Sequence, residues 1–260
     1  MTLEIHNIKK HFPIKRGLLK RTAGFVKAVD GVSLSIAQGE TLSIVGESGC
    51  GKSTLARLIM RLYEPDEGKI LLDGRDISSM TQQQLRPLRN KVQMVFQDPY
   101  SSLDPLWTIR DILMEAFHLE KPGASGPMHK RMVEGLLAVG LSTDVLNRFP
   151  HEFSGGERQR IAIARALVTR PEVLILDEVV SSLDTIVQRQ VLDLLQGLKK
   201  GFGLTYVFIS HNLRVVKGFS DKIAVMHQGK IVESGDNDKV FSSPQHPYTQ
   251  RLLSAALEYK

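Results

Sequence analysis

The sequence contains a single cysteine, Cys50, and this scarcity excludes several kinds of site. One cysteine cannot form an intrachain disulfide or a four-cysteine cluster. Tryptophan also occurs only once, and no apolar run approaches the roughly 20 residues that span a bilayer. Lys9, Lys10 and His11 interrupt any apolar region near the N-terminus, so no secretory signal is expected. We therefore expect a soluble cytoplasmic protein.

The net charge of +6 does not by itself identify a partner. Nucleic acid or anionic lipid would suit a basic protein, but so would a solvated surface with a few extra lysines. The nearest basic cluster consists of Lys15, Arg16, Lys20, Arg21 and Lys27. It lacks the interleaved aromatic residues that proteins use to bind single-stranded nucleic acid. We expect no nucleic-acid partner.

One stretch organises the rest of the chain, and we call it the phosphate loop. Its residues are Gly46, Glu47, Ser48, Gly49, Cys50, Gly51, Lys52, Ser53 and Thr54. An apolar run at 41–45 precedes it and helical spacing at 55–62 follows it, which is the strand–loop–helix context of a phosphate-binding loop. Backbone N–H groups of such a loop and of the following helix start point at phosphate oxygens. Lys52 can reach the β- and γ-phosphates and Ser53 can ligate Mg²⁺, whereas the alternative is a structural glycine turn.

Strand and helix patterns alternate along the chain. Apolar runs typical of buried strands lie at 41–45, 92–96, 173–176 and 204–210, and helical spacing lies at 157–168 and 184–200. Residues 223–226 and 230–233 resemble a terminal hairpin. The pattern predicts an α/β fold with a mostly parallel sheet.

Two regions differ from this core. Near the N-terminus, residues 3–8 and 28–36 predict strands of a small sheet, joined by an extended loop at Pro13–Val26. Strand signals vanish from Asp98 to about Phe153, which predicts a helical insert at about 98–158 with a loop at Lys121–Pro127. We assign residues 1–240 to one nucleotide-binding domain and 241–260 to a C-terminal extension.

Polar residues come directly after three of the apolar strands. Asp177 and Glu178 follow one strand, Gln97 follows another and His211 a third. Ligands of open α/β sheets lie at the carboxyl ends of the strands, so these side chains are expected to converge on one crevice.

Each of these side chains has a candidate role and a simpler alternative. Asp177 would lie beside the Mg²⁺ bound through Ser53, directly or through water. Glu178 can orient and partly deprotonate a water that attacks the γ-phosphate, or it is a surface or helix-start acid. Gln97 can ligate the metal or the water through its amide oxygen. His211 can donate to the γ-phosphate, although a lone histidine is more often structural.

The turn Ser154-Gly155-Gly156, with Glu157 after it, begins a helix and forms a second anion site by the same physics. The chain thus has two helix starts that can bind phosphate, but one metal site and one water-activating acid. The economical interpretation is that this turn of one subunit binds the γ-phosphate held on another subunit's phosphate loop. The alternative is a helix cap without further function.

Together these motifs closely resemble the ATP-binding-cassette ATPase family. They are Gly46–Thr54, Gln97, Ser154–Glu157, Leu174–Glu178, Ser182–Asp184 and His211, in the family's order over about residues 3–240. The resemblance implies a P-loop ATPase core with a small N-terminal antiparallel β subdomain and a helical insert. It also implies a head-to-tail dimer that encloses two ATP molecules, whose closure and hydrolysis drive an attached transmembrane permease.

The resemblance also implies roles for single residues. Lys52 and Ser53 would bind phosphate and Mg²⁺, with Gln97 as the metal-sensing switch. Glu178 would be the general base, His211 the γ-phosphate switch, and Asp184 a contact across the dimer. The family stacks adenine on an aromatic residue before the phosphate loop, and Phe12 fits this position best. Phe25 is the second candidate, and a core phenylalanine is the alternative.

The sequence departs from the family pattern at two places. Glu157 ends the signature turn where the family usually has glutamine, and residues 179–182 read Val-Val-Ser-Ser instead of the commoner Ala-Thr/Val-Ser-Ala. Because the backbone N–H of Glu157 still opens the helix, we expect reduced ATP affinity at most.

Residues 96–105, 149–154 and 243–249 resemble the bacterial oligopeptide, dipeptide and nickel import ATPases. This resemblance implies an extracytoplasmic binding protein, two permease subunits and a second ATPase subunit, non-identical or a second copy of the chain. It implies a peripheral position at the cytoplasmic face of the inner membrane of a bacterium or archaeon. We expect the permease to dock on Tyr100–Trp107, unless Leu103, Leu106 and Trp107 are core residues of the insert.

Two other classes compete with an importer. A soluble cassette ATPase acting on nucleic acid or ribosomes would need a long coiled-coil arm or two tandem cassettes, and neither pattern is present. A P-loop kinase or GTPase would not need Ser154-Gly155-Gly156, and a GTPase would need an Asn-Lys-x-Asp guanine reader, which is absent. We therefore expect an ATPase that couples ATP hydrolysis to the uptake of peptides or nickel.

Overall fold

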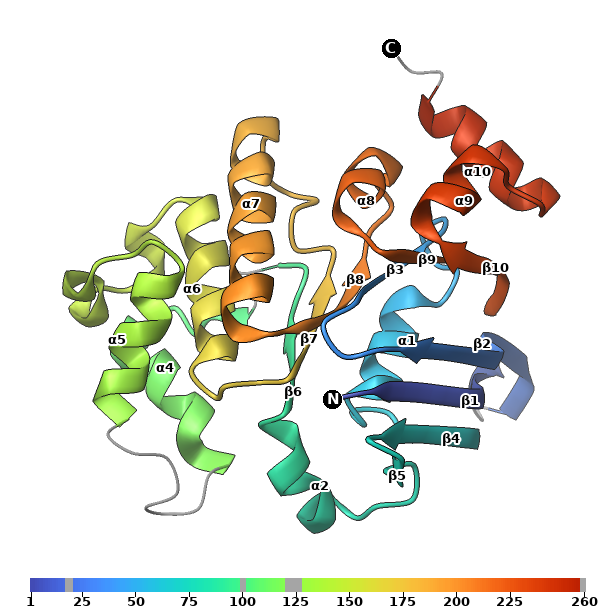
Figure 1. Cartoon of the computed structure of the whole chain (residues 1–260). Helices are drawn as coiled ribbons and strands as arrows, with labels where there is room; N and C mark the ends of the chain where they lie inside the picture. The colour runs from blue at the N-terminus through green and yellow to red at the C-terminus, as the bar shows by residue number, and fades with distance from the viewer. Residues whose placement is uncertain (17–20, 99–101, 120–127, 258–260) are drawn as a thin grey trace. The chain divides into compact units, whose positions relative to one another are not determined.

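The structure is a computed structural model that describes residues 1–16, 21–98, 102–119 and 128–257 (Figure 1). The chain forms two compact units. The first comprises Met1–Met80 and Val207–Lys260, and the second comprises Thr81–Tyr206. The predicted loop at Lys121–Pro127 lies outside the described residues, as do Tyr100 and Ser101 of the predicted docking segment.

An antiparallel sheet forms one part of the first unit. Its strands, in the order β2-β1-β4-β5, are β2 (Arg21–Ile36), β1 (Leu3–Arg16), β4 (Glu67–Leu72) and β5 (Arg75–Asp76). Leu3 of β1 lies opposite Ile36 on one side and Leu72 on the other, and all three side chains are buried. The small N-terminal sheet predicted from residues 3–8 and 28–36 is therefore present.

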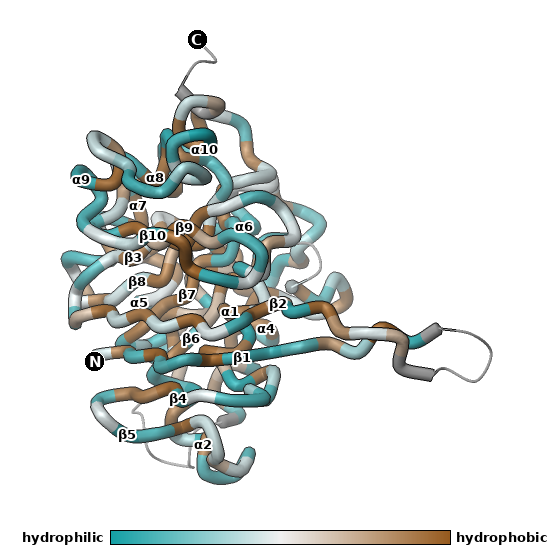
Figure 2. The backbone as a smooth tube through the Cα atoms, turned by 90° about the vertical axis from the view of Figure 1, so that its right-hand side faces the viewer, coloured by the Kyte–Doolittle hydropathy of each residue, from teal (hydrophilic) through white to brown (hydrophobic). Residues whose placement is uncertain are grey.

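The prediction of an extended loop at Pro13–Val26 is wrong, because most of this segment is a β-ribbon. β1 and β2 remain paired beyond the sheet, with Phe12 opposite Val26 and Lys15 opposite Thr22, and the ribbon runs outward in Figure 2. Register shifts after Lys10 and Ile14 break the alternation that marks a strand in the sequence. Neither face of the outer ribbon covers a core, so its hydrophobic pattern carries no strand signal.

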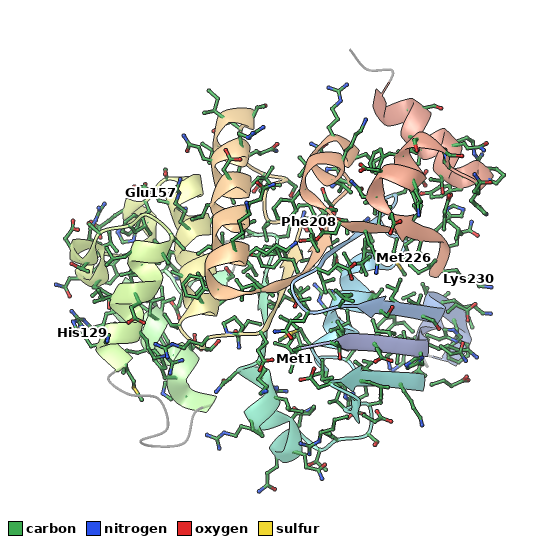
Figure 3. The ribbon with its side chains drawn as sticks, viewed as in Figure 1. Met1, His129, Glu157, Phe208, Met226 and Lys230 are labelled. Atoms are coloured by element: carbon green, nitrogen blue, oxygen red, sulfur yellow. The ribbon has the colours of Figure 1, made fainter. Side chains whose placement is uncertain are left out.

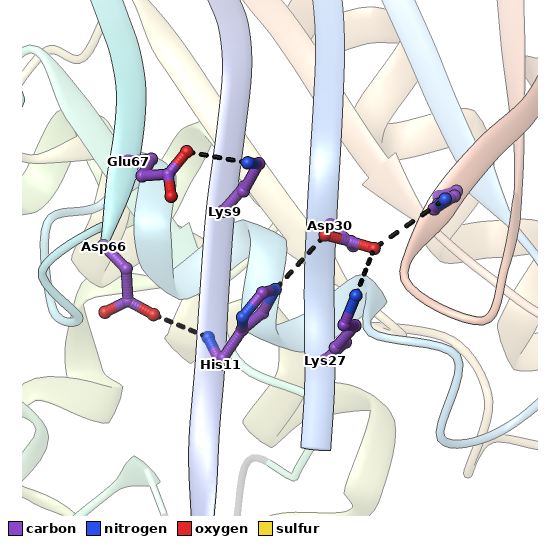
Figure 4. Close-up of polar contacts among 7 residues, drawn as sticks. Lys9, His11, Lys27, Asp30, Asp66 and Glu67 are labelled. Carbon is purple, nitrogen blue, oxygen red and sulfur yellow. Dashed lines mark hydrogen bonds and ion pairs between the residues drawn. The ribbon is translucent and has the colours of Figure 1, made fainter. Parts of the chain in front are cut away.

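Polar contacts fix β1 between its two neighbours (Figure 4). The Lys9 ammonium lies 2.7 Å from the Glu67 carboxylate, and the His11 backbone N–H donates to Asp66 at 2.7 Å. The His11 ring lies 3.2 Å from the Asp30 carboxylate. Exposed ion pairs contribute about 0–1 kcal/mol each, so these contacts specify the register more than they stabilise the fold.

The phosphate loop begins at the end of a buried strand of the first unit. Within this unit the strand order is β10-β9-β3-β8, with β3 (Thr41–Val45), β8 (Thr205–Ile209, from Val207 onward), β9 (Lys222–His227) and β10 (Lys230–Asp236). β3 and β9 are parallel, and β9 and β10 form the predicted terminal hairpin. All five residues of β3 are buried, as expected for a central strand.

Four helices accompany this sheet. They are α1 (Lys52–Ile59), α8 (Leu213–Phe219), α9 (Asn237–Ser242) and α10 (Pro247–Leu257). Only the first is predicted above, since α8 and α9 are too short to show a helical period. For α10, which has 11 residues, no helix is predicted above either.

The second unit contains the parallel pair β6 (Val92–Val95) and β7 (Val173–Asp177) together with the helices of the insert and its neighbours. The helices are α2 (Gln82–Arg89), α4 (Ile109–Glu115), α5 (Met128–Ala138), α6 (Gly155–Leu167) and α7 (Thr185–Phe202), with 3₁₀ turns at Ala116–Leu119, Thr143–Asn147 and Pro150–Glu152. Of these, α2 is not predicted, and Pro87 inside it obscures the helical pattern. The predicted insert at 98–158 lies within this unit. No helix in the described part of the chain is both long and apolar enough to cross a membrane.

Candidate functional site

The glycines of the phosphate loop allow a backbone path that other residues cannot follow. Gly46, Gly49 and Gly51 have φ angles of 151°, 83° and 113°. A Cβ atom at Gly46 would lie 2.1 Å from the Met226 carbonyl oxygen, and one at Gly51 would lie 2.0 Å from the Ala28 carbonyl oxygen. Any side chain at these two positions would therefore displace the loop from β9 or β2.

The loop ends where α1 begins, without a side chain capping the helix. Gly51 is the N-cap, no side-chain hydrogen bond is made there, and the first turn has no acidic residue. The helix start is therefore suited to an anion, because its N–H groups and positive dipole end face no carboxylate of their own turn.

Lys52 is placed to deliver a positive charge to that anion. The side chain is 4% exposed, and its ammonium donates to the Gly46 carbonyl at 2.8 Å and to the Glu47 carbonyl at 3.0 Å. Cys50 is 8% exposed beside it, and burial raises the pKa of its thiol. Cys50 is thus a neutral packing residue of the loop.

His211 follows a strand that is paired with the strand of the phosphate loop. The Ser210 N–H donates to the Ile44 carbonyl, so His211 and Gly46 come directly after neighbouring strand ends. Ser210 and Asn212 fix the turn, since the Asn212 N–H donates to the Ser210 hydroxyl at 3.0 Å and the His211 side chain is exposed. This is the strand-end position expected from the sequence.

The two candidates for adenine stacking lie in different surroundings on the β1–β2 ribbon. Phe12 is half-buried and its ring meets the Tyr63 ring edge-on, with centroids 5.5 Å apart. Phe25 is 62% exposed. Phe12 therefore has a packed, oriented ring, and its role in adenine binding stays a prediction.

In the second unit, the structure brings Gln97 and Glu178 into contact. β6 and β7 are parallel with Val95 opposite Leu176, so the residues after both strands lie side by side. The amide nitrogen of Gln97 donates to the Glu178 carboxylate at 3.1 Å. Asp177, the last residue of β7, is buried at 3% exposure.

Glu178 adopts an unusual backbone conformation. Its φ of +50° lies in the left-handed region, which is uncommon for a residue with a side chain. The Ser181 N–H and hydroxyl both donate to the Glu178 carbonyl and hold this turn. Strained residues held by their surroundings concentrate at functional sites, which agrees with the predicted role of Glu178.

The signature turn, Ser154–Glu157, is closed by its own glutamate at the start of α6 (Figure 3). The Ser154 hydroxyl donates to the Glu157 carboxylate at 2.7 Å, and the Ser154 N–H donates to the same oxygen at 2.9 Å. These two bonds, the hydroxyl first, lower the pKa of Glu157. Ser154 and Glu157 therefore form a capping box with a charged carboxylate.

The neighbouring helix limits both the turn and the predicted dimer contact. A Cβ at Gly156 would lie 2.6 Å from the Val187 side chain, so α7 leaves no room for a larger residue. Asp184 caps α7 by accepting from the N–H groups of Ile186 and Val187 at 3.1 and 2.9 Å. The structure thus gives Asp184 a local role, and its contact across a dimer stays a prediction. Ile186 is 74% exposed beside it, an apolar surface residue that the sequence analysis missed.

Glu157→Gln tests the departure from the family pattern. Glutamine retains an oxygen that can accept from Ser154, so the variant should fold, with a slightly lower melting temperature because the charge stabilised by the capping box is lost. Removing one negative charge beside the phosphate that this turn would bind should tighten ATP binding about threefold, since unit charges about 6 Å apart in water interact by about 0.7 kcal/mol. Glu157→Ala is the matched control, because losing the cap should cost about 1 kcal/mol of stability. Weaker ATP binding by Glu157→Gln, measured by calorimetry, would contradict this explanation.

Comparison with known proteins places these features in a family. The family described as ABC transporter matches residues 29–181. The oligopeptide transport ATP-binding protein AppF of Bacillus subtilis is 51% identical over 97% of this chain and 77% of its own length. OppF of the same organism, also an oligopeptide transport ATP-binding protein, is 48% identical over 97% of this chain and 81% of its length. The glutathione import ATP-binding protein GsiA of Pectobacterium atrosepticum is 46% identical over 97% of this chain but 41% of its length.

The solved structures that this chain resembles are also ATP-binding cassettes of ABC transporters. A dimeric ATP-binding cassette in a post-hydrolysis state with ADP and phosphate superposes with a TM-score of 0.78 at 29% identity, covering 90% of this chain and 98% of that one. The protein cbiO1 of Clostridium perfringens, part of an ABC transporter complex, gives a TM-score of 0.77 at 27% identity and covers 98% of this chain and 95% of its own. The predicted family and fold class are confirmed. The chain belongs to the ABC transporter family, and it is an ATP-binding cassette with ATPase activity.

Proposed function

We propose that this ATPase powers a peptide importer, as a peripheral subunit at the cytoplasmic face of a bacterial inner membrane. The oligopeptide and glutathione transport names of its relatives support a peptide cargo. The observation that carries the mechanism is the Gln97–Glu178 contact, since it joins the candidate general base to the residue directly before the insert. A change at the γ-phosphate can reach the insert through this contact.

Within this proposal the reaction is ATP hydrolysis between two paired cassettes. Lys52 binds the β- and γ-phosphates and Glu178 accepts a proton from the attacking water. The signature turn of a partner, a second ATPase of the same or a different sequence, binds the γ-phosphate, and His211 donates to it. The ATP site on each cassette is incomplete until the partner supplies Ser154 and the helix start that follows it.

The chain also offers suitable ligands for Mg²⁺. Ser53, Gln97 and Asp177 would hold the ion through hydroxyl, amide and carboxylate oxygens, which are the hard donors that Mg²⁺ prefers. The amide nitrogen of Gln97 is bound to Glu178, so its oxygen is the ligand atom. No group of three His, Cys, Asp or Glu residues in the described ranges makes a cage for a metal. When bound, the ion neutralises charge on the phosphates.

The exposed end of the insert is the proposed permease-docking surface. Leu106 is 83% and Trp107 39% exposed, whereas Leu103 is 3% exposed. Of the three apolar residues, only Leu103 is therefore a core residue of the insert. The Leu106 N–H donates to the Asp104 carboxylate at 2.9 Å, which holds the turn that presents the two exposed side chains. An ordered turn with exposed apolar residues is typical of a binding site for another protein.

Leu106→Asp should separate hydrolysis from transport. The isolated ATPase should keep wild-type turnover, because the Leu106 side chain is 83% exposed and its removal leaves no cavity. Stimulation of turnover by the permease and a peptide-loaded binding protein in proteoliposomes should fall by about tenfold or more, because a buried charge in an interface is costly. Leu137→Asp, at a 59% exposed leucine of α5, is the matched control and should retain stimulation.

The same assay tests the cargo. Peptide-loaded binding protein should stimulate turnover, whereas stimulation by nickel in its place would replace the peptide proposal with the nickel alternative. Stimulation by nucleic acid without any permease would favour a soluble cassette ATPase and contradict the importer proposal.

A further inference from the structure

The first peptide unit of the phosphate loop is held at both of its polar ends. Its oxygen, that of Gly46, accepts from the Lys52 ammonium at 2.8 Å. Its N–H, that of Glu47, donates to the Tyr248 hydroxyl at 3.2 Å. A peptide unit is planar, so hydrogen bonds to both ends determine how the whole unit is turned. Tyr248 lies in the C-terminal extension, 201 residues away along the chain.

Tyr248 is itself rigidly placed. The residue is 4% exposed, and its ring stacks on the His227 ring with centroids 3.9 Å apart and planes at 28°. Its backbone N–H donates to the His246 ring nitrogen at 3.1 Å. Burial raises the pKa of the Tyr248 hydroxyl, which therefore stays neutral and able to accept from Glu47 at physiological pH.

The start of the extension is fastened to the sheet beside the loop. The Glu233 carboxylate on β10 accepts from the N–H groups of Gln245 and His246 at 2.8 and 3.0 Å. Burial acts to raise the pKa of Glu233, but hydrogen bonds to the carboxylate, that of the Gln245 N–H first, outweigh it and the pKa is lowered. β10 pairs with β9, whose last residue is His227, so the extension is anchored next to the ring on which Tyr248 stacks.

The strand end at His227 also borders the loop directly. The Gly229 N–H donates to the Cys50 carbonyl at 3.0 Å, and the Met226 carbonyl faces Gly46. The end of β9, the following turn and Tyr248 of the extension therefore all contact the phosphate loop. All of these contacts lie within the first unit.

We infer that Tyr248 is a positioning residue for nucleotide binding, and that its hydroxyl holds the Gly46–Glu47 peptide unit in the orientation that accepts the phosphates. This rests on the phosphate loop binding ATP, as proposed above. The Lys52 ammonium has three N–H donors, and any donor that it turns from the Gly46 or Glu47 carbonyl to a nucleotide phosphate weakens its hold on the loop. The Tyr248 bond restrains the Gly46–Glu47 peptide unit independently of Lys52. The C-terminal extension would therefore set the affinity for ATP rather than the rate of hydrolysis.

Tyr248→Phe in the full chain tests this inference, because phenylalanine keeps the stack on His227 and removes only the hydroxyl. Equilibrium titration with the fluorescent analogue mant-ATP and Mg²⁺ should give a Kd roughly three- to tenfold higher, as expected for one lost hydrogen bond. KM for ATP should rise by a similar factor while kcat stays unchanged. Ser254→Ala is the matched control, since its hydroxyl donates to the Gln250 carbonyl on the same helix, and it should bind as wild type does.

Two results with Tyr248→Phe and one with the wild-type chain would overturn the inference. One is a lower melting temperature of Tyr248→Phe with wild-type Kd and KM, which would show a purely structural role. The other is unchanged values throughout. Amide hydrogen exchange gives a second measurement, which does not depend on nucleotide binding or activity. The Glu47 amide should be protected in the wild-type chain and lose protection in Tyr248→Phe. Fast exchange of that amide in the wild type would equally refute the hydrogen bond.

Lys52→Ala distinguishes this inference from the proposed function. If Lys52→Ala loses mant-ATP binding while Tyr248→Phe binds mant-ATP with wild-type affinity, only the role of Tyr248 is rejected. Wild-type binding by Lys52→Ala, or no binding by the unaltered chain, would instead reject the phosphate loop as the nucleotide site.

Discussion

Glu178→Gln is expected to retain ATP binding while hydrolysis slows by about a thousandfold, as for loss of a general base. Glutamine has nearly the same shape and keeps an oxygen that can accept from the Gln97 amide, as Glu178 does at 3.1 Å. The β7 strand end should therefore stay intact while the proton acceptor is lost. ATP would remain bound between two cassettes, and a stable ATP-dependent dimer should appear in size-exclusion chromatography.

The opposite end of the same strand provides a control. Glu172 precedes β7 and pairs with Lys91 at 2.7 Å on the surface. Glu172→Gln removes an equal charge from an exposed ion pair, which contributes about 0–1 kcal/mol, so its turnover should match that of the wild type. Near-normal turnover in Glu178→Gln would remove Glu178 from its proposed role, and hydrolysis would need another base.

Mixing two inactive variants is expected to restore turnover if the sites are shared between subunits. Lys52→Ala removes the phosphate-loop cation, and Ser154→Arg blocks the signature turn. A mixed dimer would contain one site with an intact phosphate loop and an intact opposing turn. If the chain pairs randomly with itself, about a quarter of the wild-type sites should be recovered in an equal mixture.

A second mixture tests whether the sharing has the proposed geometry. In the proposal one subunit supplies both Lys52 and Glu178 to a given ATP site. Every site in a mixed dimer of Lys52→Ala and Glu178→Gln would therefore lack one of the two, and turnover should not recover. Recovery in this mixture as well would contradict the assignment. Recovery only after adding a different ATPase subunit would indicate an obligate heterodimer.

The strand-end residues were predictable because a few consecutive residues are enough to indicate where a buried strand ends. A continuous apolar run ending in Asp177 and Glu178 specifies both a buried strand and the end at which its polar residues lie. The same rule predicted the neighbouring position of Gln97, and the parallel pairing of β6 and β7 confirms it. The phosphate loop was recognisable because its glycines are required by backbone geometry that does not depend on distant residues.

Other features are set by contacts that the hydrophobic patterns do not report. The ribbon at Pro13–Val26 was predicted as a loop, because its two strands stabilise each other across bulges and cover no core. Asp184 caps α7, a local role that is compatible with the dimer contact implied by the resemblance. Glu157 departs from the family pattern and also forms a capping box with Ser154.

The sequence by itself determined the class of this protein, because phosphate binding at a helix start and a carboxylate at a strand end are local arrangements set by a few consecutive residues. Tertiary structure alone decided how the loop is held: Tyr248, His227 and Glu47 are far apart in the chain, and only folding brings them together. The physical reason is that a hydrogen bond between segments 201 residues apart leaves no periodic or spacing pattern in either of them.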